Sequence, residues 1–514
     1  MQFQWFDIAV FLAFFAVVIG VSMYKSRKEK TGEDFFLASR GLVWPLIGLS
    51  LIAANISTEH FVGMSGQGAG VMGLAVASYE WMAAITLVIV AVFFLPKFLR
   101  SGIYTIPQYL EYRYNPAARG IMAFYMVIIY IAVSISAVVY TGGLALHTIF
   151  DLGLTKSIWL VGFIAALYTT WGGLKAVAWA DLFQGSAIII GGLITMMIGF
   201  HAVGGVRSFF AANEPKLHMI LSADHPVIPW TALVVGLWIP NFYYWGLNQF
   251  ISQRALAAKS LKQGQLGIIF AGFLKLTIPF IIIIPGIMSY QLYRDQLTAP
   301  GATTDMAYPL LIRNLVAPGI RGFILAAIAG AVISTLGSLL NSVATILTID
   351  LYQRHWKKDA SGESLVKIGR YANLVFVVVV CLIAPQLGNP KFKGIFNYIQ
   401  EFQGYISPGI CAAFIFGLFS KRTPAAAGAT SLILSVPIYG FLQWKFRWIA
   451  FLNRMAITFV IILFILAVMT LLKQLKEPKV MPVKENFDMK SSPWVKWLGL
   501  LAVVLTIALY IIFW

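Results

Sequence analysis

The sequence predicts an all-α protein that crosses a membrane many times. Of its 514 residues, 59% are hydrophobic and only 11% are charged, and the mean hydropathy is +0.81. A soluble domain carries about 25% charged residues, so this chain cannot cover its surface with charge. Apolar runs of about 20 residues recur along it, which is the length that a helix needs to span about 30 Å of hydrocarbon. Secreted, fibrous, disordered and cytosolic folds are therefore excluded.

Apolar runs long enough to span the membrane follow one another along the whole chain. We count about 14 of them: 4–24, 43–69, 73–95, 120–149, 153–172, 178–200, 229–250, 265–291, 320–350, 368–386, 395–419, 424–444, 449–472 and 494–513. The first run lacks a small-residue cleavage site, so we expect a retained helix and not a signal peptide.

The basic residues predict how the chain crosses. The formal charge is +18, but Lys and Arg lie in short loops between the runs and not in a nucleic-acid-binding cluster. If the N-terminus is outside, the segments expected inside carry 26 of the 38 Lys and Arg, and those outside carry 11. The inside segments are 25–42, 96–119, Lys175, 251–264, 351–367 with Arg370, 421–422 and 473–496. The excess of basic residues in the inside segments predicts that both termini face outside. The basic loop Trp444–Arg447 is a local exception, because this assignment places it outside.

Two of the runs are interrupted. The second has polar groups at mid-span, from Ser50 to His60, and the seventh has Pro240 and Gly246 around a polar aromatic patch. Two ordinary kinks are the alternative, because Gly and Pro are common in membrane helices. Interruptions five helices apart favour inverted repeats that bind a ligand at the midplane. Residues 1–514 then form one membrane domain, divided into an N-terminal extra helix (1–42), a first five-helix repeat (43–200), a second (229–419) and C-terminal flanking helices (424–514).

A polar aromatic face is predicted on the seventh run. Asn241, Tyr244, Trp245 and Asn248 recur at helical spacing, which would place them on one side of a helix. Amides bind hydroxyl groups and an aromatic ring covers C–H surface, so this face suits a polyhydroxylated ring. The alternative is an interfacial aromatic belt, which would not include two asparagines.

Single charges in other runs extend this polar set. Glu80 and Lys275 lie in apolar surroundings and could bind hydroxyl groups and neutralise one another, although a purely structural ion pair is an equal alternative. His60 and Gln400 complete the set. It contains no activated nucleophile, paired acid and base, or metal-ligand spacing, so we expect neither an enzyme nor a cofactor.

The ninth run offers oxygen ligands. Residues 331–342 carry small and hydroxyl side chains at helical spacing, a pattern that usually serves close helix packing. Ser334 and Thr335 also supply the oxygen that a hard cation requires. Together with carbonyls freed near Ala53 and Ile56, they could hold Na⁺ without a carboxylate.

At these residues the chain resembles the sodium/solute symporter family, most closely its bacterial sodium/galactose and animal sodium/glucose carriers. The resemblance runs through nearly the whole length. Its anchor motifs are Ala53–Ser57, Ala77–Met82, Tyr243–Gln249, Gln253–Ser260 and Leu339–Thr345. It implies a leucine-transporter-type core of two inverted five-helix repeats with two broken helices, working by alternating access.

The resemblance also implies roles for particular residues. The sugar-contacting set would be Asn55, His60, Glu80, Asn241, Trp245, Lys275 and Gln400, with Tyr244 as the inner gate. Sodium would bind carbonyls of Ala53, Ile56 and Ala331 and hydroxyls of Ser334 and Thr335, and Asp181 would lie near its exit path. The chain departs from the family pattern at His60, Ala83 and Thr335. The Thr335 change keeps the hydroxyl oxygen. The departures therefore leave the expected sodium site intact, and they leave the identity of the sugar undecided.

The sequence therefore predicts a symporter in the cytoplasmic membrane that uses Na⁺ to import a hexose such as galactose or glucose. Na⁺ and lipid are the expected partners, with no nucleic acid; oligomeric state and stoichiometry stay open. Another solute, such as myo-inositol or sialic acid, is the alternative within this class. A membrane sensor that binds solute without moving it is the alternative outside it, and such a sensor is expected to carry a soluble signalling domain, whereas residues beyond 473 predict a loop and one more helix.

Overall fold

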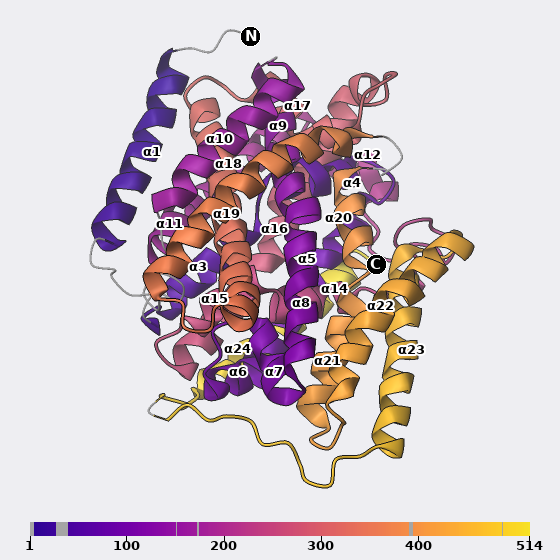
Figure 1. The fold of residues 1–514 in the computed structure, drawn as a ribbon. Coiled ribbons are helices and arrows are strands. Elements are labelled where there is room, and N and C mark those ends of the chain that lie inside the picture. Colours follow the sequence, from indigo (N-terminus) through magenta and orange to yellow (C-terminus); the bar gives the residue numbers. More distant parts are fainter. Residues whose placement is uncertain (1–4, 27–39, 151, 172–173, 390–393, 486) are drawn as a thin grey trace.

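The described part of the chain is a helical bundle without strands (Figure 1). The computed structural model describes residues 5–26, 40–150, 152–171, 174–389, 394–485 and 487–514. A single backbone bridge pairs Leu42 with Ala258. Because every backbone polar group needs a partner in hydrocarbon, an all-helical bundle is what the composition requires.

The helices follow one another along the chain in this order. The first half forms α1 (Trp5–Ser26), α3 (Trp44–Asn55), η2 (Glu59–Met64), α4 (Ser65–Ala69), η3 (Gly73–Ala77), α5 (Ser78–Ile89), η4 (Val90–Phe94), α6 (Leu95–Ser101), α7 (Ile106–Arg113), α8 (Pro116–Ile129), η5 (Tyr130–Ile135), α9 (Ser136–Phe150), α10 (Leu154–Trp171), α11 (Leu174–Ala202) and α12 (Val206–Asn213). The second half forms η6 (Glu214–Lys216), α13 (Trp230–Val234), α14 (Trp238–Phe242), η7 (Tyr243–Leu247), α15 (Gln249–Leu256), α16 (Leu261–Leu297), η8 (Thr304–Met306), α17 (Ala307–Leu315), α18 (Ile320–Thr345), η9 (Ile346–Trp356), α19 (Gly362–Ile383), η10 (Ala384–Gly388), α20 (Ile395–Gln403), α21 (Ser407–Phe419), α22 (Ala426–Lys445), α23 (Phe451–Leu472) and α24 (Pro493–Ile512).

The count of 14 spans is not confirmed. Within the described residues, 10 helices are long and apolar enough to cross a membrane, or up to 12 if each of two bent pairs is one span. The run 153–172 forms α10, and its last residue lies outside the described part. The run 229–250 is divided among α13, α14, η7 and the start of α15, none of which is long enough alone.

Both predicted interruptions occur, and a third was missed. The chain bends by 57° between α3 and η2–α4, where Ile56 is extended (φ −76°, ψ 102°). The seventh run leaves the helix again at Asn248, which is extended between η7 and α15 (φ −89°, ψ 124°). The third bend, of 46°, separates α20 from α21. Gly404 and Pro408 flank it, and both residue types weaken a continuous helix.

The long helix α16 holds both halves of the first broken helix. A Cβ on Gly267 would lie 2.7 Å from Cβ of Ile47 in α3. A Cβ on Gly286, farther along α16, would overlap the backbone carbonyl of Ser65 in α4. Two glycines thus bring α16 into backbone contact on each side of the break, as small residues do between membrane helices.

The segments expected inside meet at one end of the bundle, at the bottom of Figure 1. The segment between α23 and α24 crosses this end. Backbone hydrogen bonds join it to three of the other predicted inside segments: Leu475 N to Arg422 O (2.9 Å), Lys484 N to Arg100 O (2.7 Å) and Leu261 N to Asp488 O (2.9 Å). The predicted alternation of segments is therefore consistent with the fold, apart from the part of 25–42 that lies outside the described residues.

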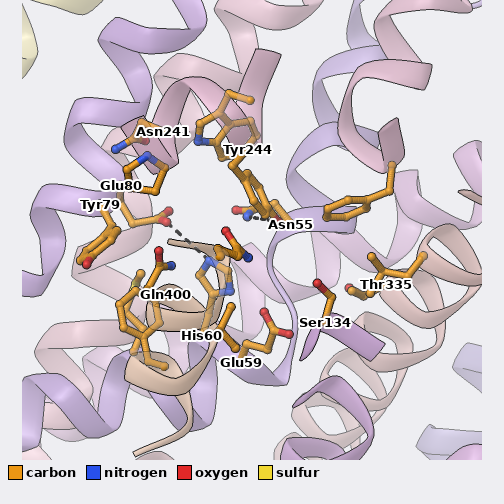
Figure 2. Close-up of a pocket in the computed structure, with 18 residues that line it drawn as sticks. Asn55, Glu59, His60, Tyr79, Glu80, Ser134, Asn241, Tyr244, Thr335 and Gln400 are labelled. Carbon is orange, nitrogen blue, oxygen red and sulfur yellow. Dashed lines mark hydrogen bonds and ion pairs between the residues drawn. The ribbon is translucent and has the colours of Figure 1, made fainter. Parts of the chain in front are cut away.

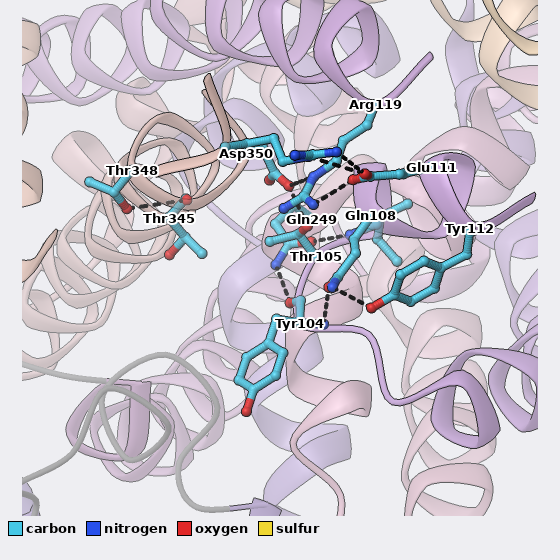
Figure 3. A network of polar contacts seen from close by, with 12 residues as sticks. Tyr104, Thr105, Gln108, Glu111, Tyr112, Arg119, Gln249, Thr345, Thr348 and Asp350 are labelled. Atoms are coloured by element: carbon cyan, nitrogen blue, oxygen red, sulfur yellow. Dashed lines mark hydrogen bonds and ion pairs between the residues drawn. The ribbon is translucent and has the colours of Figure 1, made fainter. Parts of the chain in front are cut away.

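An ion-pair network at the same end ties α7 and α8 to η9, the continuation of α18 (Figure 3). Arg119 contacts Glu111 at 2.7 Å and Asp350 at 2.6 Å, and Arg354 contacts Glu111 at 2.7 Å. Burial raises the pKa of Glu111, but the two guanidinium groups outweigh it and hold the pKa below its usual value. The far end of the helix that carries Ser334 and Thr335 is thus fixed to α7 and α8.

The glycine contacts of α16 give a prediction about stability. Gly286→Ala should lower the free energy of unfolding by about 1–3 kcal/mol, because its methyl group meets the Ser65 backbone. Gly272→Ala in the same helix is the control, since its Cβ would lie 3.5 Å from the nearest atom. Thermal unfolding of the purified variants in detergent measures the difference. Equal melting temperatures for the two variants would contradict the close contact.

Candidate functional site

A cavity of about 750 Å³ lies at the first break, between residues from both halves of the chain (Figure 2). Its wall consists of Asn55, Glu59, His60, Met64, Tyr79, Glu80, Ser134, Pro240, Asn241, Tyr244, Trp245, Phe250, Thr335, Leu339, Phe396, Ile399, Gln400 and Gln403. The cavity brings together most of the residues that the sequence singled out.

The charged centre of the site is an ion pair. Lys275 Nζ contacts Glu80 Oε2 and also donates to Asn55 Oδ1. It lies 4.8 Å from the centre of the Trp245 ring, close enough for a cation–π contact. His60 Nε2 lies 3.4 Å from Glu80 Oε1. The predicted pairing of Glu80 with Lys275 is confirmed, and α16 thereby joins α3 and α5 beneath the cavity.

The aromatic wall comes from α14 and η7. Tyr244 accepts a hydrogen bond from Asn55 Nδ2 at 2.8 Å, and its ring meets those of Trp245 and Phe250 edge-on, at 5.1 and 5.5 Å. Asn241 reaches the wall while its Nδ2 donates to Leu237 O at 3.0 Å. Tyr244 is therefore held at the break by a polar contact and by two rings.

The fourth residue of the predicted face lies elsewhere. Asn248 is not in the cavity wall; its Oδ1 accepts from Tyr130 Oη. The prediction assumed a regular helix of 3.6 residues per turn. The π-helix η7 and the extended Asn248 end that period, so the spacing held only from Asn241 to Trp245.

Several wall residues were not predicted. Gln400 lies in the wall as expected, and Gln403 follows it one turn later on α20. Glu59, next to His60, and Tyr79, next to Glu80, also reach the cavity. Glu59 and Tyr79 each directly precede a predicted residue, so adjacency in the sequence to a predicted residue was a usable signal.

The residues expected to bind sodium lie next to the cavity, between α3 and α18. Thr335 Oγ1 donates to Ala54 O at 3.0 Å, which links α18 to the broken end of α3. Ser334 lies one position along and its Oγ donates to Asp181 Oδ1. Ala53, Ile56 and Ala331 are fully buried.

Asp181 lies at the centre of a second buried ion pair. Arg254 NH2 is 3.1 Å from Asp181 Oδ2, and Ser50 Oγ donates to the same oxygen at 2.5 Å. The same guanidinium also contacts Ser338 Oγ at 2.6 Å. This network connects α3, α11, α15 and α18.

Comparison with known proteins agrees with this geometry. A sequence model described as "Sodium:solute symporter family" matches residues 35–434. The chain belongs to this family. It is therefore a multi-pass membrane transporter of a sodium-coupled symporter family and not an enzyme.

Similar proteins within the family differ in their named solutes. The symporter is 42% identical to the sodium/glucose cotransporter of Vibrio parahaemolyticus, over 90% of this chain and 89% of that one. It is 33% identical to sodium/myo-inositol cotransporter 2 of Oryctolagus cuniculus, over 85% and 69%. A sodium-coupled sialic acid symporter of known structure matches with a TM-score of 0.80 at 23% identity, covering 94% of this chain and all of that chain, which supports the fold alone.

The two adjacent tyrosines of η7 give a test of the aromatic wall. Tyr244→Phe removes the hydroxyl that Asn55 contacts and should weaken the apparent affinity for the transported solute in uptake assays by about 0.5–1.5 kcal/mol, roughly two- to tenfold. Tyr243→Phe is the matched control, because the Tyr243 hydroxyl is buried without a partner and lies outside the wall. Similar losses in both variants would contradict the assigned orientation of η7.

Proposed function

We propose that this symporter imports a sugar, such as galactose or glucose, together with Na⁺. The observation that carries the proposal is the combination of groups in one cavity. Carboxylates, amides, a phenol and an indole line the cavity, whereas Lys275 pairs with Glu80 without itself lining it. Hydroxyl groups can accept from the amides and donate to the carboxylates, while the aromatic wall covers the C–H faces of the ring.

The sugar would enter between Gln400 and Tyr244, with Asn55, Glu80 and Asn241 as further partners. Lys275 contacts Asn55 and Glu80 in the empty site, so its ammonium group keeps both oriented for hydroxyl groups. His60 Nδ1 is buried without a partner and offers one more polar atom at the break. Trp245 and Tyr244 would form the hydrophobic side, with Tyr244 covering the sugar from the inner side.

Sodium would bind between the broken helix and α18. Carbonyls of Ala53, Ile56 and Ala331 and hydroxyls of Ser334 and Thr335 form a set of neutral oxygen ligands, as a hard cation prefers. Because Ser334 donates its proton to Asp181, the lone pairs of its oxygen stay available to a cation. Asp181 would receive the ion on its way out.

Coupling would follow from the position of the two sites. An ion that bridges α3 and α18 fixes the break, and the same break carries Asn55 and His60 of the sugar site. Sodium would thus prepare the sugar site facing outside, and the two inverted repeats (43–200 and 229–419) would rock to expose both ligands inside. Each positive charge that enters down the potential contributes about 2.3 kcal/mol per 100 mV.

The proposed setting is the cytoplasmic membrane, with both termini outside. The end where the basic segments gather would then face the cytoplasm. Among other solutes, myo-inositol fits the same neutral hydroxyl chemistry. Sialic acid fits less well, because its carboxylate would meet Glu59 and Glu80 while Lys275 is already paired.

Uptake into proteoliposomes tests the proposal. Labelled galactose, glucose, myo-inositol and sialic acid would be offered with sodium or potassium outside. We expect sodium-dependent accumulation of a hexose. Binding of a hexose without accumulation would favour a sensor, and sodium-dependent accumulation of only myo-inositol or sialic acid would replace the sugar assignment.

The sodium site predicts the effect of a double substitution. Ser334→Ala with Thr335→Ala removes two of the few side-chain oxygens and should abolish sodium stimulation of uptake. The fold should persist, because small residues remain at the helix contact. Uptake at graded sodium concentrations measures this, and sodium stimulation equal to that of the unchanged protein would reject the site.

The sugar site makes its sharpest prediction at Glu80. Glu80→Gln keeps the shape but loses the charge, so sugar affinity should fall about tenfold or more, corresponding to about 1.5–3 kcal/mol for a charge-assisted bond. Sodium binding without sugar should change far less. Loss of sodium affinity alone would make Glu80 a cation ligand, and no change in either would leave it a structural ion pair.

The matched control is Glu401→Gln. Glu401 also pairs with a buried cation, Arg454, at 2.5 Å, and it lies on α20 next to Gln400 but outside the cavity wall. This variant should keep sugar affinity. A loss in the control equal to that of Glu80→Gln would mean that breaking any buried ion pair disturbs the fold.

A further inference from the structure

One carboxylate of the cavity has no role in the set described so far. Glu59 is the first residue of η2, directly after the break, and its side chain reaches the cavity beside Ser134 (Figure 2). Thr335, which belongs to the proposed sodium site, lines the same cavity. Glu59 therefore faces the space that both ligands would share.

Two other carboxylates at or beside this space have a cationic partner. Glu80 is neutralised by Lys275 and Asp181 by Arg254. For Glu59, the contact found among the described residues is a backbone one, from its N–H to Ser57 Oγ at 3.1 Å, and its carboxylate has neither an ion pair nor a hydrogen bond. With Glu59 ionised, the empty site carries one uncompensated negative charge.

We propose that Glu59 is the counter-charge of the coupling ion, so that the cavity becomes electrically neutral when Na⁺ is bound. This inference rests on the proposed sodium site, whose ligands are all neutral oxygens. A carboxylate in the same water-poor cavity attracts the ion, although it need not touch it. Glu59 is a positioning charge and not a sodium ligand.

The same charge would oppose movement of the carrier with sugar alone. An unpaired carboxylate is costly to enclose in a protein surrounded by lipid. The cavity can close over sugar and Na⁺ as a neutral whole, whereas closure over sugar alone would enclose the charge of Glu59. The residue thus supplies a reason why sugar does not cross without the ion.

Two variants separate the charge from the shape of the side chain. Glu59→Gln is nearly isosteric and neutral, and Glu59→Asp keeps the charge on a shorter side chain. In proteoliposome uptake we expect Glu59→Gln to raise the half-saturating sodium concentration tenfold or more. It should also increase sugar exchange in sodium-free medium severalfold. Glu59→Asp should restore most of the sodium affinity, and Glu401→Gln should leave both quantities unchanged.

The outcomes distinguish this inference from the function on which it rests. A half-saturating sodium concentration within twofold of the unchanged protein, without sodium-free exchange, would overturn the role of Glu59. If the Ser334→Ala, Thr335→Ala variant loses sodium stimulation at the same time, the sodium site survives and only the counter-charge fails. If that variant is also unaffected, the proposed sodium site itself fails.

A direct binding measurement covers the case in which Glu59→Gln does not transport. Sodium titration of the detergent-purified variant, followed by intrinsic tryptophan fluorescence, reports ion affinity without a transport cycle. A weakened affinity that Glu59→Asp restores supports the proposal. Unchanged affinity in Glu59→Gln overturns it, because the charge would then act on a step other than ion binding.

Discussion

The central site depends on the interruption of one membrane helix between Asn55 and Glu59. Hydrocarbon offers no partner to a free backbone group, so a break of 57° can persist only where neighbouring helices cover it. Two glycines of α16 permit that cover on both sides, and Thr335 of α18 donates to the carbonyl of Ala54 at the broken end. The interruption that weakens the helix also supplies the polar backbone on which the proposed ion site relies.

Around this break, most of the buried charges occur in pairs that join different helices. Lys275 connects α16 to α3 and α5 through Asn55 and Glu80, and Arg254 connects α15 to α11 through Asp181. Such pairs contribute little net stability, because each ion loses its hydration. Their value is positional: they fix carboxylates and amides at defined places in a bundle whose other contacts are apolar and non-directional. Against this background Glu59 stands out, because its carboxylate reaches the cavity and has no ion pair among the described residues.

The site is also connected to the end of the molecule where the basic segments gather. The helix that carries Ser334 and Thr335 continues as η9, where Asp350 and Arg354 enter the network with Arg119 and Glu111. An ion that pulls α18 toward α3 therefore acts on a helix whose far end is held by charge-assisted contacts. Within that network the Arg354–Glu111 pair is partly exposed, with side chains 33% and 17% accessible, so salt screens it more than the buried pairs at the cavity.

The sequence by itself determined the membrane fold class, the first two interruptions and eight of the 18 residues that line the cavity, because composition and single polar residues in apolar runs are local signals with a high energetic cost. It did not find the bend after Gln403, the departure of Asn248 from the predicted face, or Glu59 in the cavity wall. Those depend on π-helical and extended backbone, which shifts side chains away from regular spacing. The sequence suggested that Lys275 and Glu80, 195 residues apart, could pair. Only tertiary structure decided that they do pair while the Glu59 carboxylate has no such partner among the described residues, because pairing depends on which helices pack together and not on residue type.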